Sequence, residues 1–263
     1  MEKYLKKFII YTFVWFILLI GVIGAFIFVF DMPIVGGILQ IVGAWTSTLV
    51  FFAMFKKIYP KDNLWHYIRR QFRGEISLPV IISILSFFIV ILVGNIVFIS
   101  LAEDKMPSSL LISSFSLLIS SFFSCLIKGP LGEEIGWRAF FLTELEKKYG
   151  LLKAAIMTGL LWSFWHLPLI LVSGDSLNIM IIQFVCNICA FIGLTLAMAI
   201  LYKGNKNLVV PILIHQFFNY SLSIIKDDTV ASTIGITICT CIFAVVCLVA
   251  YIYKSKQKTQ SEI

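Results

Sequence analysis

Apolar runs long enough to cross a bilayer recur from one end of this 263-residue chain to the other. They fall at about 8–30, 34–55, 79–102, 109–128, 151–172, 177–202, 208–225 and 230–253. A helix rises about 1.5 Å per residue, so about 20 residues cross the ~30 Å hydrocarbon layer. Because lipid offers no partners for unpaired backbone groups, such runs fold as helices. The sequence therefore predicts an all-α integral membrane protein with about eight transmembrane helices.

Composition agrees with the bilayer as solvent. Hydrophobic residues make up 60% of the chain and charged residues 13%, whereas a soluble domain carries roughly 25% charged residues. The six cysteines all lie inside predicted spans, at Cys125, Cys186, Cys189, Cys239, Cys241 and Cys247. Cys186 and Cys189 form a C-x-x-C pattern, but without partner ligands nearby. We interpret the cysteines as small buried residues, with metal or redox chemistry as the alternative.

Lysine and arginine gather in alternate connections between the predicted spans, which indicates orientation. The rich set holds Lys3, Lys6 and Lys7; Lys56, Lys57, Lys61, Arg69, Arg70 and Arg73; Lys147, Lys148 and Lys153; Lys203 and Lys206; and Lys254, Lys256 and Lys258. The other set holds Asp31; Glu103, Asp104 and Lys105; Asp175; and Lys226, Asp227 and Asp228. We therefore expect a multi-pass cell-membrane protein with both termini cytoplasmic. The formal net charge of +7 reflects this topology and does not indicate a nucleic-acid partner.

The spans divide into two groups within one membrane domain. Residues 1–105 hold the first three spans and a basic segment at 56–78, residues 106–253 hold spans four to eight, and 254–263 form a basic cytoplasmic tail. The basic segment mixes aromatic side chains such as Trp65 and Tyr67 with arginines. This mixture is typical of an interfacial helix on an anionic leaflet.

The chemistry-bearing residues begin in the segment 129–150. Pro130 suits the first turn of a helix, so Glu133 and Glu134 lie near its start. Adjacent helical residues point about 100° apart, so the two carboxylates cannot share a face. Arg138 is four residues beyond Glu134 and can pair with it. Glu133 is left without a local counter-charge, which suits a general base or acid.

Two later spans carry the other candidates. His166 lies deep in an apolar span, four residues after Trp162, and Pro168 is expected to kink that helix. His215 and Asn219 lie one turn apart on a shared face of the seventh span. Ionisable groups inside a membrane usually face the bundle interior or a wet cavity.

Each of these motifs alone has a structural interpretation. Glu134 with Arg138 could be a helix-stabilising pair, and either histidine could be a polar contact between helices. A structural network would not require one unpaired carboxylate and two imidazoles on three spans. Convergence is not trivial, because His166 lies about 20 Å from the start of its span and His215 about half as far.

Serines recur at helical spacing in the fourth span. They are Ser109, Ser113, Ser116, Ser120 and Ser124. We interpret the stripe as close packing of small residues, and one wall of a hydrated substrate cleft is the alternative.

The motifs, in their order along the chain, resemble the CPBP family, the CAAX-protease and bacteriocin-processing (Abi) intramembrane endopeptidases. The resemblance rests on Glu133-Glu134-x-x-x-Arg138, Trp162-x-x-x-His166 and His215-x-x-x-Asn219 with their flanking residues, and covers about 125–222. Many relatives have Phe where Trp162 stands and Gly where Ala139 stands; both differences keep side-chain class or size.

The resemblance implies peptide-bond hydrolysis in a conical cavity open to the cytoplasmic side. Glu133 would activate a water held with His166, and His215 and Asn219 would donate hydrogen bonds to the oxyanion. Glu134 and Arg138 would support the helix that carries Glu133.

A zinc-dependent version of the same chemistry is the alternative. Glu133, His166 and His215 could supply three ligands and leave a fourth position for water. No H-E-x-x-H helix is present and no acidic partner for either histidine is evident, so a glutamate-dependent mechanism without a cofactor is favoured.

The expected partners are the lipid bilayer and a peptide or protein substrate. CAAX-like, bacteriocin and immunity-related peptides are all open as substrates. Two other functions remain as alternatives: a non-catalytic bacteriocin-immunity or scaffold protein, and a transporter in which Glu and His relay protons. No inverted repeat that would favour a transporter is visible.

Overall fold

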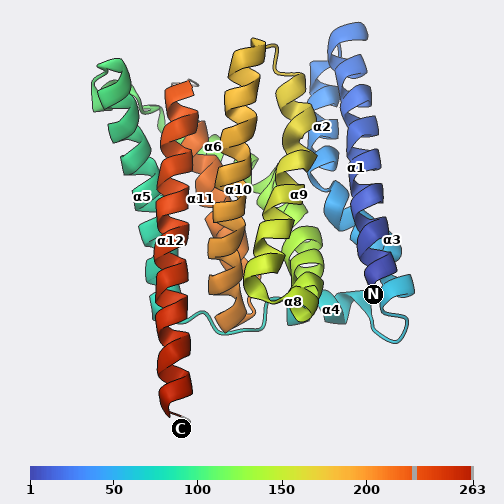
Figure 1. Cartoon of the computed structure of the whole chain (residues 1–263). Coiled ribbons are helices and arrows are strands. Elements are labelled where there is room, and N and C mark those ends of the chain that lie inside the picture. Colours follow the sequence, from blue (N-terminus) through green and yellow to red (C-terminus); the bar gives the residue numbers. More distant parts are fainter. Residues whose placement is uncertain (227–229, 262–263) are drawn as a thin grey trace.

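The computed structural model describes residues 1–226 and 230–261, and nearly all of this part is helical (Figure 1). Asp227 and Asp228 of the predicted acidic loop lie outside the described residues, as do residues 262–263 of the basic tail and the side chain of Lys258. Within the described part there is no β-strand, only an isolated bridge between Leu111 and Ile225. The predicted all-α class is confirmed.

The elements follow the apolar runs, with short helical pieces between them. They are α1 Glu2–Gly24, η1 Ala25–Val29, α2 Pro33–Ala44, α3 Thr46–Ile58, α4 Leu64–Arg70, α5 Leu78–Glu103, η2 Pro107–Ser109, α6 Phe115–Ile127, α7 Pro130–Glu134, η3 Ile135–Leu142, α8 Thr143–Tyr149, α9 Leu151–Leu171, α10 Leu177–Asn205, α11 Val209–Ser223 and α12 Val230–Ser261. Prolines begin α2 and α7, where a missing backbone N–H costs nothing. Gly150, at φ +78°, separates α8 from α9.

Six helical runs in the described residues are long and apolar enough to cross a membrane. They are Glu2–Val29, Leu78–Glu103, Phe115–Tyr149, Leu151–Leu171, Leu177–Asn205 and Val230–Gln257. The pair α2 and α3 can add a seventh span, bent by 51°. Helix α11 occupies the remaining predicted span, but its 15 residues reach only about 22 Å. The structure thus agrees with an integral membrane protein, with a bend in the second predicted span and a short helix in the seventh.

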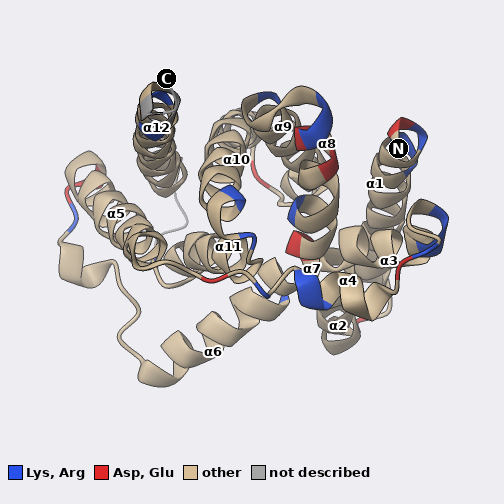
Figure 2. Ribbon diagram, turned by 90° about the horizontal axis from the view of Figure 1, so that it is seen from below, with Lys and Arg blue, Asp and Glu red and all other residues tan. Residues whose placement is uncertain are grey.

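Helices α9 and α10 lie in the centre of the bundle, between α5 and α12 on one side and α1, α2 and α3 on the other (Figure 1). Helix α10 packs against α9, α11 and α12, while α5 packs against α12 and α11. On the other side, α1 packs against α2, α3 and α9. Both termini lie at the same end of the bundle, together with α4 and α8 (Figure 1). Viewed from that end, Lys and Arg gather on α8, near the N-terminus and in the connection after α3 (Figure 2).

The fourth span begins later than predicted. Its first part is extended, because backbone hydrogen bonds tie Ile112 to Ile224 and Lys226 to Leu110, and the helix starts only at Phe115. The expectation of one serine face from residue 109 is therefore wrong at its beginning. Ser116, Ser120 and Ser124 lie on α6, whereas Ser109 lies in η2 and Ser113 in the extended segment.

The interfacial segment is anchored to the bundle as well as exposed. Asn63 caps α4 by accepting hydrogen bonds from the backbone N–H groups of Trp65 and His66. Trp65 is exposed, as expected of an interfacial side chain. Tyr67 is buried and donates its hydroxyl hydrogen to the carbonyl of Ala139 at 2.8 Å. Helix α4 therefore supports η3, the element that follows the two glutamates.

The interpretation of the cysteines as buried residues holds for one of them. Cys247 is buried, Cys189 is exposed, and the other four are partly exposed, all as free thiols. Helix faces that meet lipid need no protein cover, so an apolar sequence does not distinguish core from lipid-facing positions.

Candidate active site

Glu133 lies in the single turn of α7 with its side chain almost fully buried. The backbone N–H of Glu133 donates to the carbonyl of Gly129 at 3.0 Å, which fixes the turn. Carboxylate Oε2 of Glu133 accepts a hydrogen bond of 2.7 Å from the indole N–H of Trp162 on α9. No cationic side chain pairs with Glu133 among the ion pairs of the described residues. The carboxylate is thus held by a neutral donor.

Glu134 points in a different direction, as its position beside Glu133 requires. Its Oε1 lies 3.1 Å from Nη1 of Arg138, so the predicted helical pair is confirmed. The same oxygen lies 2.8 Å from Nδ1 of His215 on α11. The expectation that neither histidine has an acidic partner is therefore wrong. Glu134 and His215 are 81 residues apart, and only the packing of α11 against α7 brings them together.

Arg138 is fully buried in the π-helical turn η3. Its guanidinium carbon lies 3.9 Å from the ring centroid of Trp162, and Nη2 donates to the hydroxyl of Thr195 at 3.3 Å. The indole of Trp162 therefore offers its face to a cation and its N–H to Glu133, two interactions that its polarity favours. Trp162 therefore contacts Glu133 directly and Glu134 indirectly, through Arg138.

His166 is partly exposed and lies in the second half of α9. Its Nδ1 lies 2.9 Å from the carbonyl oxygen of Trp162, and since a carbonyl can only accept, Nδ1 carries the hydrogen. In the neutral ring, Nε2 then has a free lone pair. The rings of Trp165 and Phe191 each lie 4.8 Å from the imidazole, edge to face. Pro168 lies inside the same helix, which ends at Leu171.

His215 and Asn219 lie beside the backbone that leads into α7. A Cβ atom at Gly129 would be 2.8 Å from Nδ2 of Asn219 and 3.6 Å from Nε2 of His215. Glycine at position 129 therefore leaves the space in which these two groups approach the chain just before Glu133. An amide donor and an imidazole nitrogen thus both lie close to Gly129.

The sequence predicts that His166 and His215 lie at different depths in the membrane, and in the structure both lie against the side chain of Trp162. Its ring contacts both imidazoles, at 5.4 Å to His166 and 5.0 Å to His215 between centroids. Trp162 lies one helical turn nearer the start of α9 than His166, which is about 6 Å. The structure thus brings Glu133, His166 and His215 around one indole.

A cavity of about 200 Å³ opens beside Glu133 and His166. Helices α1 and α2 supply its other walls, including Phe16, Ile20 and Gln40, and Lys128 lines it from the end of α6. A cavity of this size with polar groups on its wall can hold water. The proposed base and His166 therefore face a common space.

Helices from the first half of the chain build this site, although the sequence motifs there are weak. At the bend between α2 and α3, the indole N–H of Trp45 donates to the carbonyl of Ile127 at 3.0 Å. A Cβ at Gly132 would lie 2.5 Å from the Trp45 ring, and one at Gly136 would lie 2.6 Å from the backbone of Ser47. The glycines allow α7 and η3 to contact this bend directly.

Sequence reasoning did not single out Lys128, Gln40 or Thr195. Lys128 carried a usable signal, because it is a charged residue at the end of an apolar run. Gln40 and Thr195 are single polar residues in apolar spans, a pattern that is equally typical of contacts between helices.

The zinc alternative requires Glu133, His166 and His215 as one ligand set. In the part of the chain that the structure describes, no group of three or more His, Cys, Asp or Glu side chains is placed to hold a metal ion. The Nδ1 atoms of both histidines have partners, the carbonyl oxygen of Trp162 for His166 and the carboxylate of Glu134 for His215. The choice between the glutamate-dependent and the zinc-dependent mechanism stays a prediction.

Fold and site together define a class: a multi-spanning helical membrane protein with a buried carboxylate-imidazole centre beside a cavity. Residues 114–221 match the family model described as "Type II CAAX prenyl endopeptidase Rce1-like". The resemblance to CPBP-family proteases that the motifs predict is confirmed by this match and by a relative.

That relative is "CAAX prenyl protease 2" of Methanococcus maripaludis, 31% identical over 109 residues. The similar region is 38% of this chain and 40% of the relative, so the chain covers less than half of the relative's length.

Proposed function

We propose that the chain is an intramembrane endopeptidase that hydrolyses a membrane-associated peptide with a glutamate-activated water. The observation that carries the proposal is the shared cavity: Glu133, held by the Trp162 indole, and His166 line the same space. A non-catalytic scaffold would not require a carboxylate without a cationic partner to face that space. The family match over 114–221 supports the same activity.

The first step is attack of water on the peptide carbonyl carbon. A water between Glu133 and His166 gives one proton to the Glu133 carboxylate, while Nε2 of His166 accepts a hydrogen bond from its other O–H. The new C–O bond converts the carbonyl oxygen to an oxyanion. Glu133 then passes the proton to the leaving nitrogen, and the C–N bond breaks. Water is consumed, and the products are a carboxylic acid and an amine, which after proton transfer between them are a carboxylate and an ammonium.

The oxyanion would meet the Nδ2 amide of Asn219 and the ring of His215. Because Nδ1 of His215 bonds to the Glu134 carboxylate, the neutral ring has no hydrogen on Nε2. His215 can donate to an oxyanion only when Nε2 also carries a hydrogen, and the contact of Nδ1 with Glu134 holds the ring in place. Glu134 is therefore a positioning residue in this mechanism, and more than a support for the helix.

We propose the substrate class from the name of one relative and from the membrane setting. The name of the archaeal relative supports a peptide with a CAAX-like end, and bacteriocin or immunity-related peptides are the alternatives within the proposed activity. Lys- and Arg-rich connections are typically cytoplasmic, so we propose that this end of the bundle, with both termini, lies in the cytoplasm.

The test compares wild type, Glu133→Gln and Glu75→Gln, purified in detergent, on a quenched-fluorescent library of membrane-associated peptides with CAAX-like and other ends. Glu75 is an exposed acid outside the site and serves as the matched control. We expect cleavage by wild type and Glu75→Gln, and a loss of at least about 100-fold with Glu133→Gln. Equal cleavage by all three would exclude Glu133 as the base.

A second arm adds a strong chelator to the active protein. Full activity after chelation supports the glutamate mechanism. Loss of activity that added zinc restores would replace it with the metal-dependent version. Proton-coupled uptake into proteoliposomes that depends on Glu133 would instead support a transporter.

A further inference from the structure

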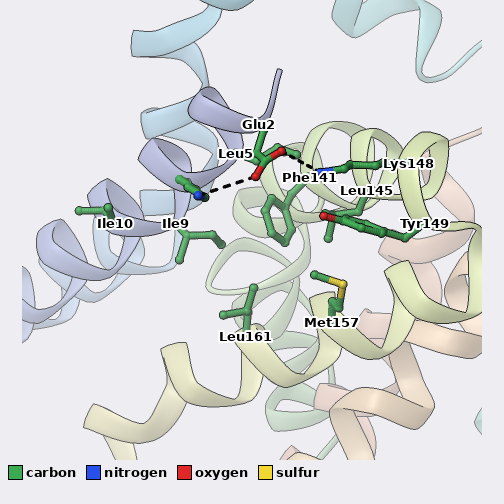
Figure 3. A pocket seen from close by; sticks show the side chains of 11 residues that line it. Glu2, Leu5, Ile9, Ile10, Phe141, Leu145, Lys148, Tyr149, Met157 and Leu161 are labelled. Carbon is green, nitrogen blue, oxygen red and sulfur yellow. Dashed lines mark hydrogen bonds and ion pairs between the residues drawn. The ribbon is translucent and has the colours of Figure 1, made fainter.

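A second cavity lies at the end of the bundle that holds both termini. Figure 3 shows it between the start of α1, the segment η3–α8 and the first half of α9. Its volume of about 350 Å³ falls within the ~300–1,000 Å³ range of small-molecule sites. Its walls are apolar and include Ile9 of α1, Phe141 and Leu145, and Met157 and Leu161 of α9.

Charged side chains stand at one edge of this apolar cavity. Oε2 of Glu2 lies 2.7 Å from Nζ of Lys148 (Figure 3). Oε1 of Glu2 lies 3.7 Å from Nζ of Lys6. Two ammonium groups share one carboxylate, so these three side chains carry a net charge of +1. All three are exposed, with side-chain exposures of 74% for Lys6, 46% for Lys148 and 60% for Glu2. An added anion can reach both lysines.

The residues around the cavity are of the kinds that meet lipid chains and headgroups. Ile10 and Met157, which line it, are also exposed on the outside of the bundle, where the neighbours of a spanning helix are lipid chains. Tyr149 stands at the same edge, with its ring 4.8 Å from Nζ of Lys148. Tyrosine and lysine are typical of the headgroup level of a bilayer. An occupant must therefore have an apolar part in the membrane and an anionic part at its surface.

We propose that this cavity binds one anionic phospholipid, with an acyl chain between α1 and α9 and the phosphate on Lys6 and Lys148. Basic pockets between spanning helices on the cytoplasmic side are suited to anionic headgroups, and this edge lies at the Lys- and Arg-rich end (Figure 2). Further along the two helices, beyond the cavity, α1 meets α9 directly through the rings of Phe16 and Trp165, whose centroids are 4.1 Å apart. The acyl chain would fill the cavity between α1 and α9, up to that ring contact. The proposal does not depend on the proteolytic function.

The test measures lipid binding to the full chain by native mass spectrometry in mild detergent, titrated with phosphatidylglycerol or phosphatidylcholine. Wild type should bind one phosphatidylglycerol about 10-fold more tightly than phosphatidylcholine. The pair Lys6→Gln/Lys148→Gln should lose this preference. The matched pair Lys3→Gln/Lys7→Gln, which removes the same charge from α1 outside the cavity lining, should retain it.

Two further variants separate the acyl site from the charged edge. Glu2→Gln frees both lysines from their acid partner and should bind phosphatidylglycerol more tightly than wild type. Met157→Trp places a larger side chain in the cavity at a partly exposed position and should weaken binding of both lipids without lowering the melting temperature.

Equal losses in the two lysine pairs would show attraction by overall charge and would overturn the site. Equal binding of the two lipids by wild type would overturn the anionic headgroup. Unchanged binding by Met157→Trp would overturn the acyl chain's position.

Discussion

Trp162 is the residue on which the proposed active site is centred. It donates its indole N–H to Glu133, faces the guanidinium of Arg138 and contacts both histidine rings. A phenylalanine at this position could fill the same space but could not donate a hydrogen bond to Glu133. The orientation of the Glu133 carboxylate in this chain therefore depends on an indole N–H.

Trp162→Phe should lower kcat by roughly 10-fold or more with little change in KM. The lost hydrogen bond is one to a charged acceptor, about 1.5–3 kcal/mol, while the aromatic packing stays. Steady-state kinetics on the cleaved peptide measure this. Trp165→Phe is the control, since Trp165 contacts His166 through its ring but makes no hydrogen bond to Glu133. An unchanged kcat in Trp162→Phe would show that the indole N–H is dispensable.

Glu134→Gln should lower both the melting temperature and kcat. The substitution leaves the fully buried Arg138 without its carboxylate, and breaking a buried ion pair costs about 3–5 kcal/mol. It also removes the acid partner of His215.

The double variant Glu134→Gln/Arg138→Met separates these two effects. It should recover much of the melting temperature, because Arg138 is no longer left as a buried cation without its carboxylate, yet stay slow. Recovery of kcat together with stability would mean that Glu134 acts only on the fold.

At the scale of elements, the site depends on how closely α7 and η3 approach the bend between α2 and α3. Glycines at 132 and 136 face Trp45 and Ser47 at distances that no side-chain carbon could occupy. Two hydrogen bonds complete the contact: the backbone N–H of Gly136 donates to Thr48 Oγ1 at 3.2 Å, and Ser47 Oγ donates to the Glu133 carbonyl at 3.4 Å. The bend holds the helix that carries the proposed base.

Gly136→Ala should therefore destabilise the protein by about 1–3 kcal/mol and reduce cleavage. An added Cβ would meet the Ser47 backbone at 2.6 Å, so η3 would have to move. Gly37→Ala in α2 is the matched control, because nothing lies within 4 Å of its added Cβ, and alanine is the better helix former. Melting curves and activity in detergent compare the two. Equal effects of both substitutions would contradict the packing argument.

At the scale of the whole molecule, the two termini and the basic connections share one end of the bundle (Figures 1 and 2). This agrees with an even number of crossings and with the alternation of Lys and Arg in the sequence. If one terminus is shown to be cytoplasmic, the other terminus and the basic connections are therefore expected to be cytoplasmic too.

A fluorescent-protein reporter fused after the C-terminus should be active, as in the cytoplasm, whereas a periplasm-dependent phosphatase there should be inactive. The phosphatase fused after Gly174, in the connection between α9 and α10, should give the opposite result. Cell-based reporter assays measure both. Activity of the phosphatase at the C-terminus would reverse the proposed orientation, and with it the leaflet assigned to the lipid site.

The hydrophobic pattern alone determined the membrane class, the helical content and the approximate places of the spans, because a bilayer requires long apolar helices whatever the tertiary contacts are. The pairing of Glu134 with Arg138 also followed from sequence, since helical spacing is local. The bend at Trp45, the shortness of α11 and the extended start of the fourth span did not, since they depend on contacts with distant segments.

The sequence indicated Glu133, His166, His215 and Asn219 as candidates, but their roles in catalysis stay predictions. Only the tertiary structure decided which groups meet: Glu133 with the Trp162 indole, and Glu134 with His215 across 81 residues. It also placed Lys128 and the walls from α1 and α2 beside the site. Spacing along a helix predicts which side chains share a face, but which helix that face meets is set by packing between distant parts of the chain.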